Sequence, residues 1–265
     1  MITKIGFPEY KTLVQEIKRD KIEKGSFINK YERTLSAIIS WAFIRFMPSL
    51  KPNAVSVANV TLMLLVLILP TIFSVADTFQ IYLIVFTQFV LFTIGSILDK
   101  VDGEIARFKK HFTQAGIYYD LLFHFLYVFS FYLFLGIFFF NLTLNDYFWQ
   151  FSLLLSFLVT MYKMFGKIRH HIKYKILIEN HSSLITDYIS RGSRTLSIFR
   201  FIDYFFFTQY EWTRIIFLIF IITSIFWPVT ISIIYTLFMI LLGIITVYRL
   251  LFWYPRNALY SEDQL

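Results

Sequence analysis

The sequence predicts an all-α integral membrane protein with six transmembrane helices and an amphipathic helix at the membrane interface near the N-terminus. Hydrophobic residues make up 57% of the chain and the mean hydropathy is +0.64, which excludes an ordinary soluble domain. Several apolar runs approach the roughly 20 residues that a helix needs to cross a bilayer. Turns that lack Lys and Arg alternate with segments rich in them, which is typical of a multi-span protein.

Residues 1–51 are expected to form N-terminal helices on the cytoplasmic face and at the membrane interface. Residues 1–30 are charged and carry only a weak apolar stripe, so we expect a solvated helix there. The segment that follows is too short and too mixed to span the bilayer, which indicates a helix lying in the interface with Trp41 at headgroup depth. Such a helix either anchors the chain or ties its cytoplasmic face to the membrane plane. Its apolar residues recur at helical spacing, and they are Leu35, Ile38, Ile39, Ala42, Phe43 and Phe46.

Residues 52–256 are expected to form one six-span domain, and residues 257–265 a cytoplasmic tail. The fifth apolar run is short for a transmembrane helix, and Pro228 marks a tight turn between the fifth and sixth runs. The apolar runs place the six spans at about 55–76, 79–99, 115–140, 146–165, 213–227 and 229–252.

Basic residues lie on one side of the expected bundle. The turns near Asp77, Asp146 and Pro228 contain no Lys or Arg, so all 25 basic residues fall on the other side or at its helix ends. The positive-inside rule then places both termini in the cytoplasm, together with the polar stretch from Asp99 to His124. This orientation explains the formal net charge of +8, so we do not expect nucleic acid as a partner. The lack of cysteine excludes disulfides and thiolate chemistry.

The stretch from Asp99 to His124 carries acidic side chains where they are rare in a membrane protein and usually functional. Asp99 and Asp102 are three residues apart and share a helix face. Asp120 and His124 are four residues apart and share a face of the next helix. Because only a short polar turn joins the two helices, we expect them to be antiparallel neighbours whose four side chains converge just inside the membrane surface. Converging carboxylates need a cation, and hard oxygen ligands suit Mg²⁺, Mn²⁺ or Ca²⁺.

Residues next to Asp102 are suited to a phosphorylated ligand. Gly103 and Ala106 remove side-chain bulk, which lets a flat or phosphorylated ligand approach the backbone. Arg107 offers a planar fork of donors for phosphate oxygens. A metal, a phosphate group and a nearby base together indicate phosphoryl transfer.

At these residues the chain resembles the CDP-alcohol phosphotransferase family. The family pattern is Asp-x-x-Asp-Gly-x-x-Ala-Arg, eight residues, Gly-x-x-x-Asp-x-x-x-Asp, and its last position is His124 here. The segment from Lys51 to Ser56 also resembles the Pro-Asn-x-x-Thr/Ser element that precedes the first span in this family and lies beside the nucleotide. The residues that match the main pattern in order and spacing are Asp99, Asp102, Gly103, Ala106, Arg107, Gly116 and Asp120.

The resemblance implies an enzyme that moves a substituted phosphate from a CDP-linked alcohol or CDP-diacylglycerol to an acceptor hydroxyl and releases CMP. It also implies a Mg²⁺ or Mn²⁺ site and a homodimer embedded in membrane lipids. The catalytic residues it implies are His124 and Asp120, and the metal ligands are Asp99, Asp102 and Asp120. The residues it assigns to the nucleotide or its phosphates are Asn53, Ser56, Gly103, Ala106, Arg107, Thr113 and Gly116.

His124 stands where the family has an Asp that is thought to be the general base. A neutral imidazole can accept a proton near pH 7, so His124 is able to act as the base of an active enzyme. A second interpretation is a shifted preference for metal or acceptor, with the base elsewhere. Imidazole ligates Mn²⁺, whereas Mg²⁺ prefers oxygen. A third interpretation is an inactive relative that binds nucleotide or lipid without turnover.

The sequence leaves both substrates open. The local sequence SILDKVDGEIAR resembles most the branch that contains inositol-phosphate transferases, but glycerol phosphate, amino alcohols, lipid alcohols and glycans remain alternative acceptors. The basic segment 163–211 either orients the chain and attracts anionic headgroups or holds an anionic acceptor or the donor's lipid phosphate. Arg191 and Arg194 are the candidates for that second role, because Gly192 and Ser193 between them leave backbone donors free.

A transporter is a rival function for a protein with six spans and intramembrane acids. Transporters place their substrate and ion sites near the middle of the membrane. The acidic residues of this chain fall at the cytoplasmic ends of the expected spans. The sequence therefore favours a transferase over a transporter.

Overall fold

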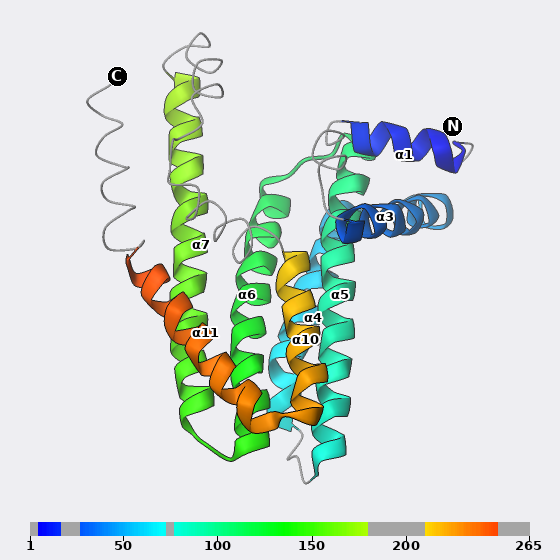
Figure 1. Cartoon of the computed structure of the whole chain (residues 1–265). Helices are drawn as coiled ribbons and strands as arrows, with labels where there is room; N and C mark the ends of the chain where they lie inside the picture. Colours follow the sequence, from blue (N-terminus) through cyan, green and yellow to red (C-terminus); the bar gives the residue numbers. More distant parts are fainter. Residues whose placement is uncertain (1–4, 17–26, 73–76, 180–209, 249–265) are drawn as a thin grey trace. The chain divides into compact units, whose positions relative to one another are not determined.

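The computed structural model describes residues 5–16, 27–72, 77–179 and 210–248, and the regular structure in these residues is all helical (Figure 1). The helices are named in the order of the chain. They are α1 (Phe7–Gln15), α3 (Phe27–Phe46), α4 (Pro52–Ile72), α5 (Thr78–Lys109), α6 (Gln114–Thr143), α7 (Tyr147–Glu179), α10 (Tyr210–Phe226) and α11 (Pro228–Tyr248).

Four helical stretches among the described residues are long and apolar enough to cross a membrane, as the sequence predicted for a multi-pass membrane protein. They are Pro52–Leu69, Phe79–Lys109, Gln114–Thr143 and Pro228–Tyr248. The expected fourth and fifth spans fall in α7 and α10, which are helical but are not among these four. The apolar part of α10 is Phe217–Phe226, which is shorter than a bilayer is thick. The count of six spans therefore stays a prediction.

Helix α5 extends about ten residues beyond the span expected at 79–99. Asp77 starts it, because its carboxylate accepts a hydrogen bond of 2.8 Å from the backbone N–H of Gln80. Lys110 ends it in the left-handed conformation, with φ of 51° and its N–H directed to carbonyls of the last turn. Asp99 and Asp102 therefore both lie on one continuous helix, at and just beyond the expected end of the span.

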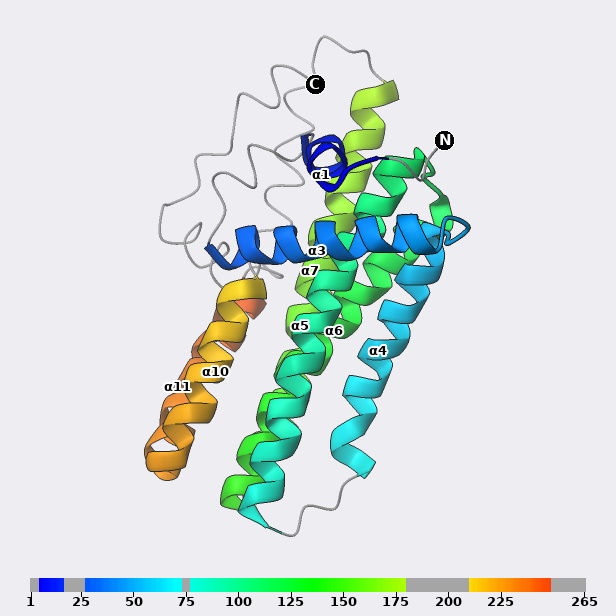
Figure 2. The same cartoon turned by 90° about the vertical axis from the view of Figure 1, so that its right-hand side faces the viewer.

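The chain divides into two compact units, residues 1–130 and 131–265, and the boundary falls inside α6. In the first unit α4 packs along α5. Helices α1 and α3 pack against the end of α5 that carries Asp99, and α3 lies across it (Figures 1 and 2). A small apolar core joins these helices, and its buried members are Tyr10, Val14, Ile44, Val55, Val101 and Ile105.

Helix α3 turns its polar side toward the protein. Its buried residues include Glu32, Ser36 and Ser40, which recur every four residues along one face. The opposite face exposes large apolar side chains, with Phe27 84% and Phe46 76% exposed. This arrangement is the reverse of a surface helix in a soluble protein, whose apolar face is the buried one.

In the second unit, α6 and α7 approach each other closely at Gly136. A Cβ atom at this glycine would lie 2.2 Å from Ser152 Cβ and 2.7 Å from the carbonyl oxygen of Phe148. Ser152 is also hydrogen-bonded to the hydroxyl of Tyr235 in α11, at 2.6 Å. The ring of Tyr235 stacks on Phe139, with ring centroids 4.3 Å apart. Gly136 therefore lets the helices of this unit reach contact distance.

Replacement of Gly136 by Ala is expected to destabilise the second unit, because the added methyl group would meet backbone atoms that cannot move without separating two helices. Overpacking of this kind typically costs about 1–3 kcal/mol. The matched control is Gly243→Ala, since a Cβ there would lie at an ordinary 3.7 Å from Leu155. Thermal unfolding in detergent should show a lower midpoint for Gly136→Ala and an equal or higher midpoint for Gly243→Ala. Equal midpoints for the two variants would contradict this account of the crossing.

Candidate metal site

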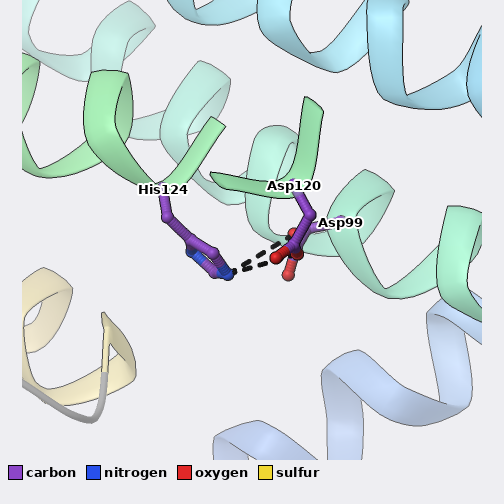
Figure 3. Close-up of side chains that lie close together, drawn as sticks. All are labelled: Asp99, Asp120 and His124. Carbon is purple, nitrogen blue, oxygen red and sulfur yellow. Dashed lines mark ion pairs between the residues drawn. The ribbon is translucent and has the colours of Figure 1, made fainter. Parts of the chain in front are cut away.

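Asp99, Asp120 and His124 form a cluster of possible metal ligands in the first unit (Figure 3). Each residue offers one ligand atom, and these atoms lie within 4.8 Å of one another. His124 Nε2 is 3.4 Å from Asp120 Oδ1 and 4.0 Å from Asp99 Oδ1. The Asp120 side chain is 49% exposed, so the cluster is open to a ligand on that side. The cluster thus combines one residue of α5 with two residues of the next helix, α6.

Close packing of α4, α5 and α6 positions this cluster. Gly95 lies one helical turn before Asp99 on α5. A Cβ at Gly95 would lie 2.6 Å from Met63 Cε and 3.3 Å from Asn59 Oδ1 of α4, and 3.5 Å from the Phe123 ring of α6. The missing side chain lets three helices meet next to Asp99. The carboxylate of Asp99 is therefore held at a fixed distance from the side chains of α6.

Asp102 lies beside the cluster and is not one of its three members. Its Oδ2 accepts a hydrogen bond of 2.6 Å from the hydroxyl of Ser56, which is buried in α4. The charges of Asp99 and Asp120 act on Asp102, so the three carboxylates share one neighbourhood. The sequence predicted Asp102 as a metal ligand on the same footing as Asp99, whereas the structure gives it a hydrogen-bond partner on α4.

Three other predicted residues lie together where α4 and α6 begin. Thr113 Oγ1 donates a hydrogen bond of 3.0 Å to Asn53 Oδ1 and accepts one of 3.0 Å from the backbone N–H of Gly116. A Cβ at Gly116 would lie 3.2 Å from both of these side-chain oxygens. Gly116 therefore lets the start of α6 approach the start of α4.

The guanidinium of Arg107 lies along α5 over Gly103. A Cβ at Gly103 would be 3.3 Å from Arg107 Nη1. Arg107 Nε donates a hydrogen bond of 2.7 Å to the carbonyl of Val14 in α1. Its Nη2 is buried and has no hydrogen-bond partner in the described part of the chain. Ala106 occupies the adjacent position on α5, and its carbonyl takes part in closing the helix end.

Sequence reasoning missed two residues of α5 that fix this region. Glu104 is completely buried, and Lys109 Nζ donates to the carbonyls of Pro48 and Leu50 at 2.6 Å each. Lys109 therefore binds the short segment that connects α3 to α4. The available signals were a basic residue in a last helical turn and the four-residue spacing of Lys100 and Glu104. Arg191 and Arg194, predicted to bind the acceptor, lie outside the described residues.

Comparison with known proteins returned no match to a protein-family model and no match among curated proteins.

Proposed function

We propose that this chain is a membrane transferase of the CDP-alcohol phosphotransferase type. It moves a substituted phosphate from a CDP-linked alcohol or CDP-diacylglycerol to an acceptor hydroxyl and releases CMP. The observation that carries the proposal is the convergence of Asp99, Asp120 and His124 within 4.8 Å. Asp102 and Arg107, which the sequence pattern assigns to metal and phosphate, lie next to these residues on α5.

The donor set of the cluster fits a divalent cation. Carboxylate oxygens suit Mg²⁺ and Mn²⁺, and the imidazole nitrogen of His124 suits Mn²⁺ better than Mg²⁺. Asp99, Asp102 and Asp120 would hold the ion. When bound, a divalent ion supplies positive charge that neutralises the diphosphate and favours departure of CMP.

The other residues bind and orient the donor. Arg107 presents its Nη atoms to a phosphate, because the carbonyl of Val14 already fixes its Nε. Gly103 and Ala106 carry little side-chain bulk, and the nucleotide would lie beside them and beside the Arg107 guanidinium that covers Gly103. Ser56, Asn53 and Thr113 supply hydrogen-bonding groups from the starts of α4 and α6.

His124 acts as the general base that takes the proton from the attacking acceptor hydroxyl. The Asp120 and Asp99 carboxylates near its Nε2 would orient the imidazole and stabilise the imidazolium that forms. The same geometry supports a second role, because an Nε2 atom that faces two carboxylates is also placed to ligate a metal. The alternative function is an inactive relative that binds nucleotide or lipid without turnover. The observation behind this alternative is that His124 stands where the family has an Asp.

The membrane arrangement is part of the proposal. We place six spans in the bilayer, both termini and the cluster on the cytoplasmic side, and α3 in the interface. The crossing of α3 over the end of α5 (Figure 2) and the exposed apolar face of α3 support that placement. We also propose a homodimer, as the family resemblance implies, and binding of the acceptor or of the donor's lipid phosphate by Arg191 and Arg194.

Release of CMP from a panel of donors tests the function directly. Purified protein in lipid nanodiscs is incubated with CDP-diacylglycerol or a CDP-linked small alcohol, with a set of acceptor alcohols, and with Mg²⁺ or Mn²⁺. We expect CMP from at least one donor, and none after chelation of the metal. Binding of CDP without CMP release from any donor would support the inactive relative. A protein that neither binds CDP nor releases CMP would contradict the family assignment.

A further inference from the structure

Helices α3 and α5 meet through two matching polar stripes. The stripe on α5 consists of Ser96, Lys100 and Glu104, and the stripe on α3 consists of Glu32, Ser36 and Ser40, each at four-residue spacing. Lys100 Nζ forms an ion pair with Glu32 Oε2, and the hydroxyl of Ser96 donates to the same oxygen at 3.3 Å.

The carboxylate of Glu104 accepts hydrogen bonds from three side chains and lies near a fourth, the guanidinium of Arg33. Ser36 donates to its Oε1 at 2.9 Å and Ser40 to its Oε2 at 2.8 Å. Gln15 at the end of α1 donates to Oε1 at 3.0 Å, and Arg33 lies 3.9 Å away. A carboxylate with no exposed surface is stable only when its oxygens are satisfied in this way. Both N-terminal helices therefore donate hydrogen bonds to this one side chain of α5.

The polar stripe of α5 diverges from the cluster side of the helix along its length, because Ser96 and Lys100 lie roughly 60° and 100° from Asp99 around the axis. A helix turns by about 100° per residue, so Glu104 is rotated by roughly 140° from Asp99 and roughly 160° from Asp102. Helix α3 therefore contacts one side of α5, while Asp102 contacts Ser56 of α4 and Asp99 lies near His124 of α6. A rotation of α5 about its axis would break the polar contacts and move the carboxylates of the cluster at the same time.

A polar contact fixes the register of two helices more strictly than an apolar one. Apolar surfaces tolerate small slides and rotations, whereas buried charged pairs lose their partners when displaced. Helix α3 also contributes Ile44 to the apolar core, but the charged and hydroxyl partners of its contact with α5 all lie on the polar face, and the other face carries exposed apolar residues such as Phe27 and Ile38. The exposed apolar face of α3 is therefore suited to contact lipid, and its buried polar face fixes the register of α3 on α5.

We propose that α3 is a positioning element for the metal cluster, and that Lys100 and Glu104 are the positioning residues through which it acts. The catalytic part of this proposal rests on the proposed transferase function. The structural part does not, because the contact between α3 and α5 is measurable without turnover.

A charge exchange between Glu32 and Lys100 tests the proposal. Lys100→Glu places two carboxylates together and should release α3, while the double variant Glu32→Lys with Lys100→Glu restores an ion pair of reversed sign. We expect Lys100→Glu to weaken Mn²⁺ binding and lower kcat by roughly 10- to 100-fold, as the loss of supporting contacts does at other metal sites. The double variant should recover most of both. Glu104→Gln should weaken Mn²⁺ binding, with Glu9→Gln on the exposed side of α1 as its matched control.

The position of α3 is followed separately by spin labels. The chain has no native cysteine, so labels at Ile38→Cys in α3 and Leu64→Cys in α4 report one distance; both sites are exposed, at 44% and 42%. We expect one narrow distance distribution in the parent protein, a broad one with Lys100→Glu, and a narrow one in the charge-exchanged variant. Should Lys100→Glu fail to fold, Ser36→Ala with Ser40→Ala is the milder replacement.

Three outcomes overturn the proposal: a broadened distance with unchanged Mn²⁺ affinity, lost affinity with an unchanged distance, or no recovery in the charge-exchanged variant. Failure of the proposed function looks different. In that case the parent protein releases no CMP from any donor, while the label distances and the Mn²⁺ affinity still respond to Lys100→Glu as described.

Discussion

Replacement of Asp99 by Asn is expected to reduce metal-dependent CMP release by at least about 10²–10³-fold, the usual effect of removing one group that stabilises charge in a transition state. Asp99 is the only member of the cluster that α5 contributes. An amide has nearly the same shape as a carboxylate, so the variant should fold, but it removes the negative charge that attracts a divalent ion. The expected loss is therefore in metal binding and turnover together, and excess Mn²⁺ should recover part of the activity.

The matched control for this prediction is Asp77→Asn. Asp77 lies at the other end of the same helix, where it caps the first turn by accepting from Gln80. Asn caps a helix about as well as Asp, so stability should change little and activity should not change. The metal assignment is wrong if Asp99→Asn and Asp77→Asn release CMP at the same rate, or if a chelator leaves the parent rate unchanged.

His124→Ala is expected to lower kcat by roughly 10²–10⁴-fold, which is the range for loss of a general base. Binding of the CDP donor should change much less, because His124 is not among the residues proposed to contact the nucleotide or its phosphates. His124→Asp should keep measurable activity, since a carboxylate at this position can also accept a proton. Rates are compared at saturating donor and Mn²⁺, with KM measured alongside.

His111→Ala is the control for this substitution, because His111 is exposed in the turn between α5 and α6. Mn²⁺ affinity separates the two roles that the geometry allows for His124. A base predicts a low kcat with nearly normal Mn²⁺ affinity, whereas a metal ligand predicts weakened Mn²⁺ binding in His124→Ala. If His124→Ala has normal activity, His124 is neither the general base nor a required metal ligand.

The helical membrane character of the chain was predictable from hydropathy, but the lengths of the helices were not. Hydropathy falls at Asp99, and the second span was therefore expected to end there. The helix continues to Lys109 because Asp99–Lys109 contains no proline and its one glycine is tolerated. Hydropathy marks the part of a helix that suits lipid, and the helix itself ends where Lys110 adopts a left-handed conformation.

Sequence spacing predicts which residues of the candidate cluster lie together when both residues are on one face of the same helix. Asp120 and His124 are four residues apart and lie together, and the short turn brings Asp99 to them. Asp102 is rotated by roughly 60° from Asp99 around α5, since three residues do not complete a turn. That rotation directs it to Ser56 of α4, a partner 46 residues away in sequence. Long-range contacts of this kind leave no local signal.

The orientation of α3 was also beyond the reach of local pattern. Its apolar residues and its polar residues occupy separate faces, and the sequence alone does not say which face meets the protein. The half-buried Lys100 and the buried Glu104 of α5, which bind the polar face of α3, decide it. They lie more than sixty residues further along the chain, at positions that the family pattern leaves variable.

The proposed function depends on a divalent ion that binds where Asp99, Asp120 and His124 converge, and a titration with Mn²⁺ measures this binding without turnover. Purified protein is titrated with Mn²⁺ while the electron paramagnetic resonance signal of the free ion is followed, with and without CDP. We expect saturable binding of Mn²⁺ that CDP strengthens and that the double variant Asp99→Asn with Asp120→Asn abolishes. Equal Mn²⁺ binding by the parent protein and the double variant would contradict it.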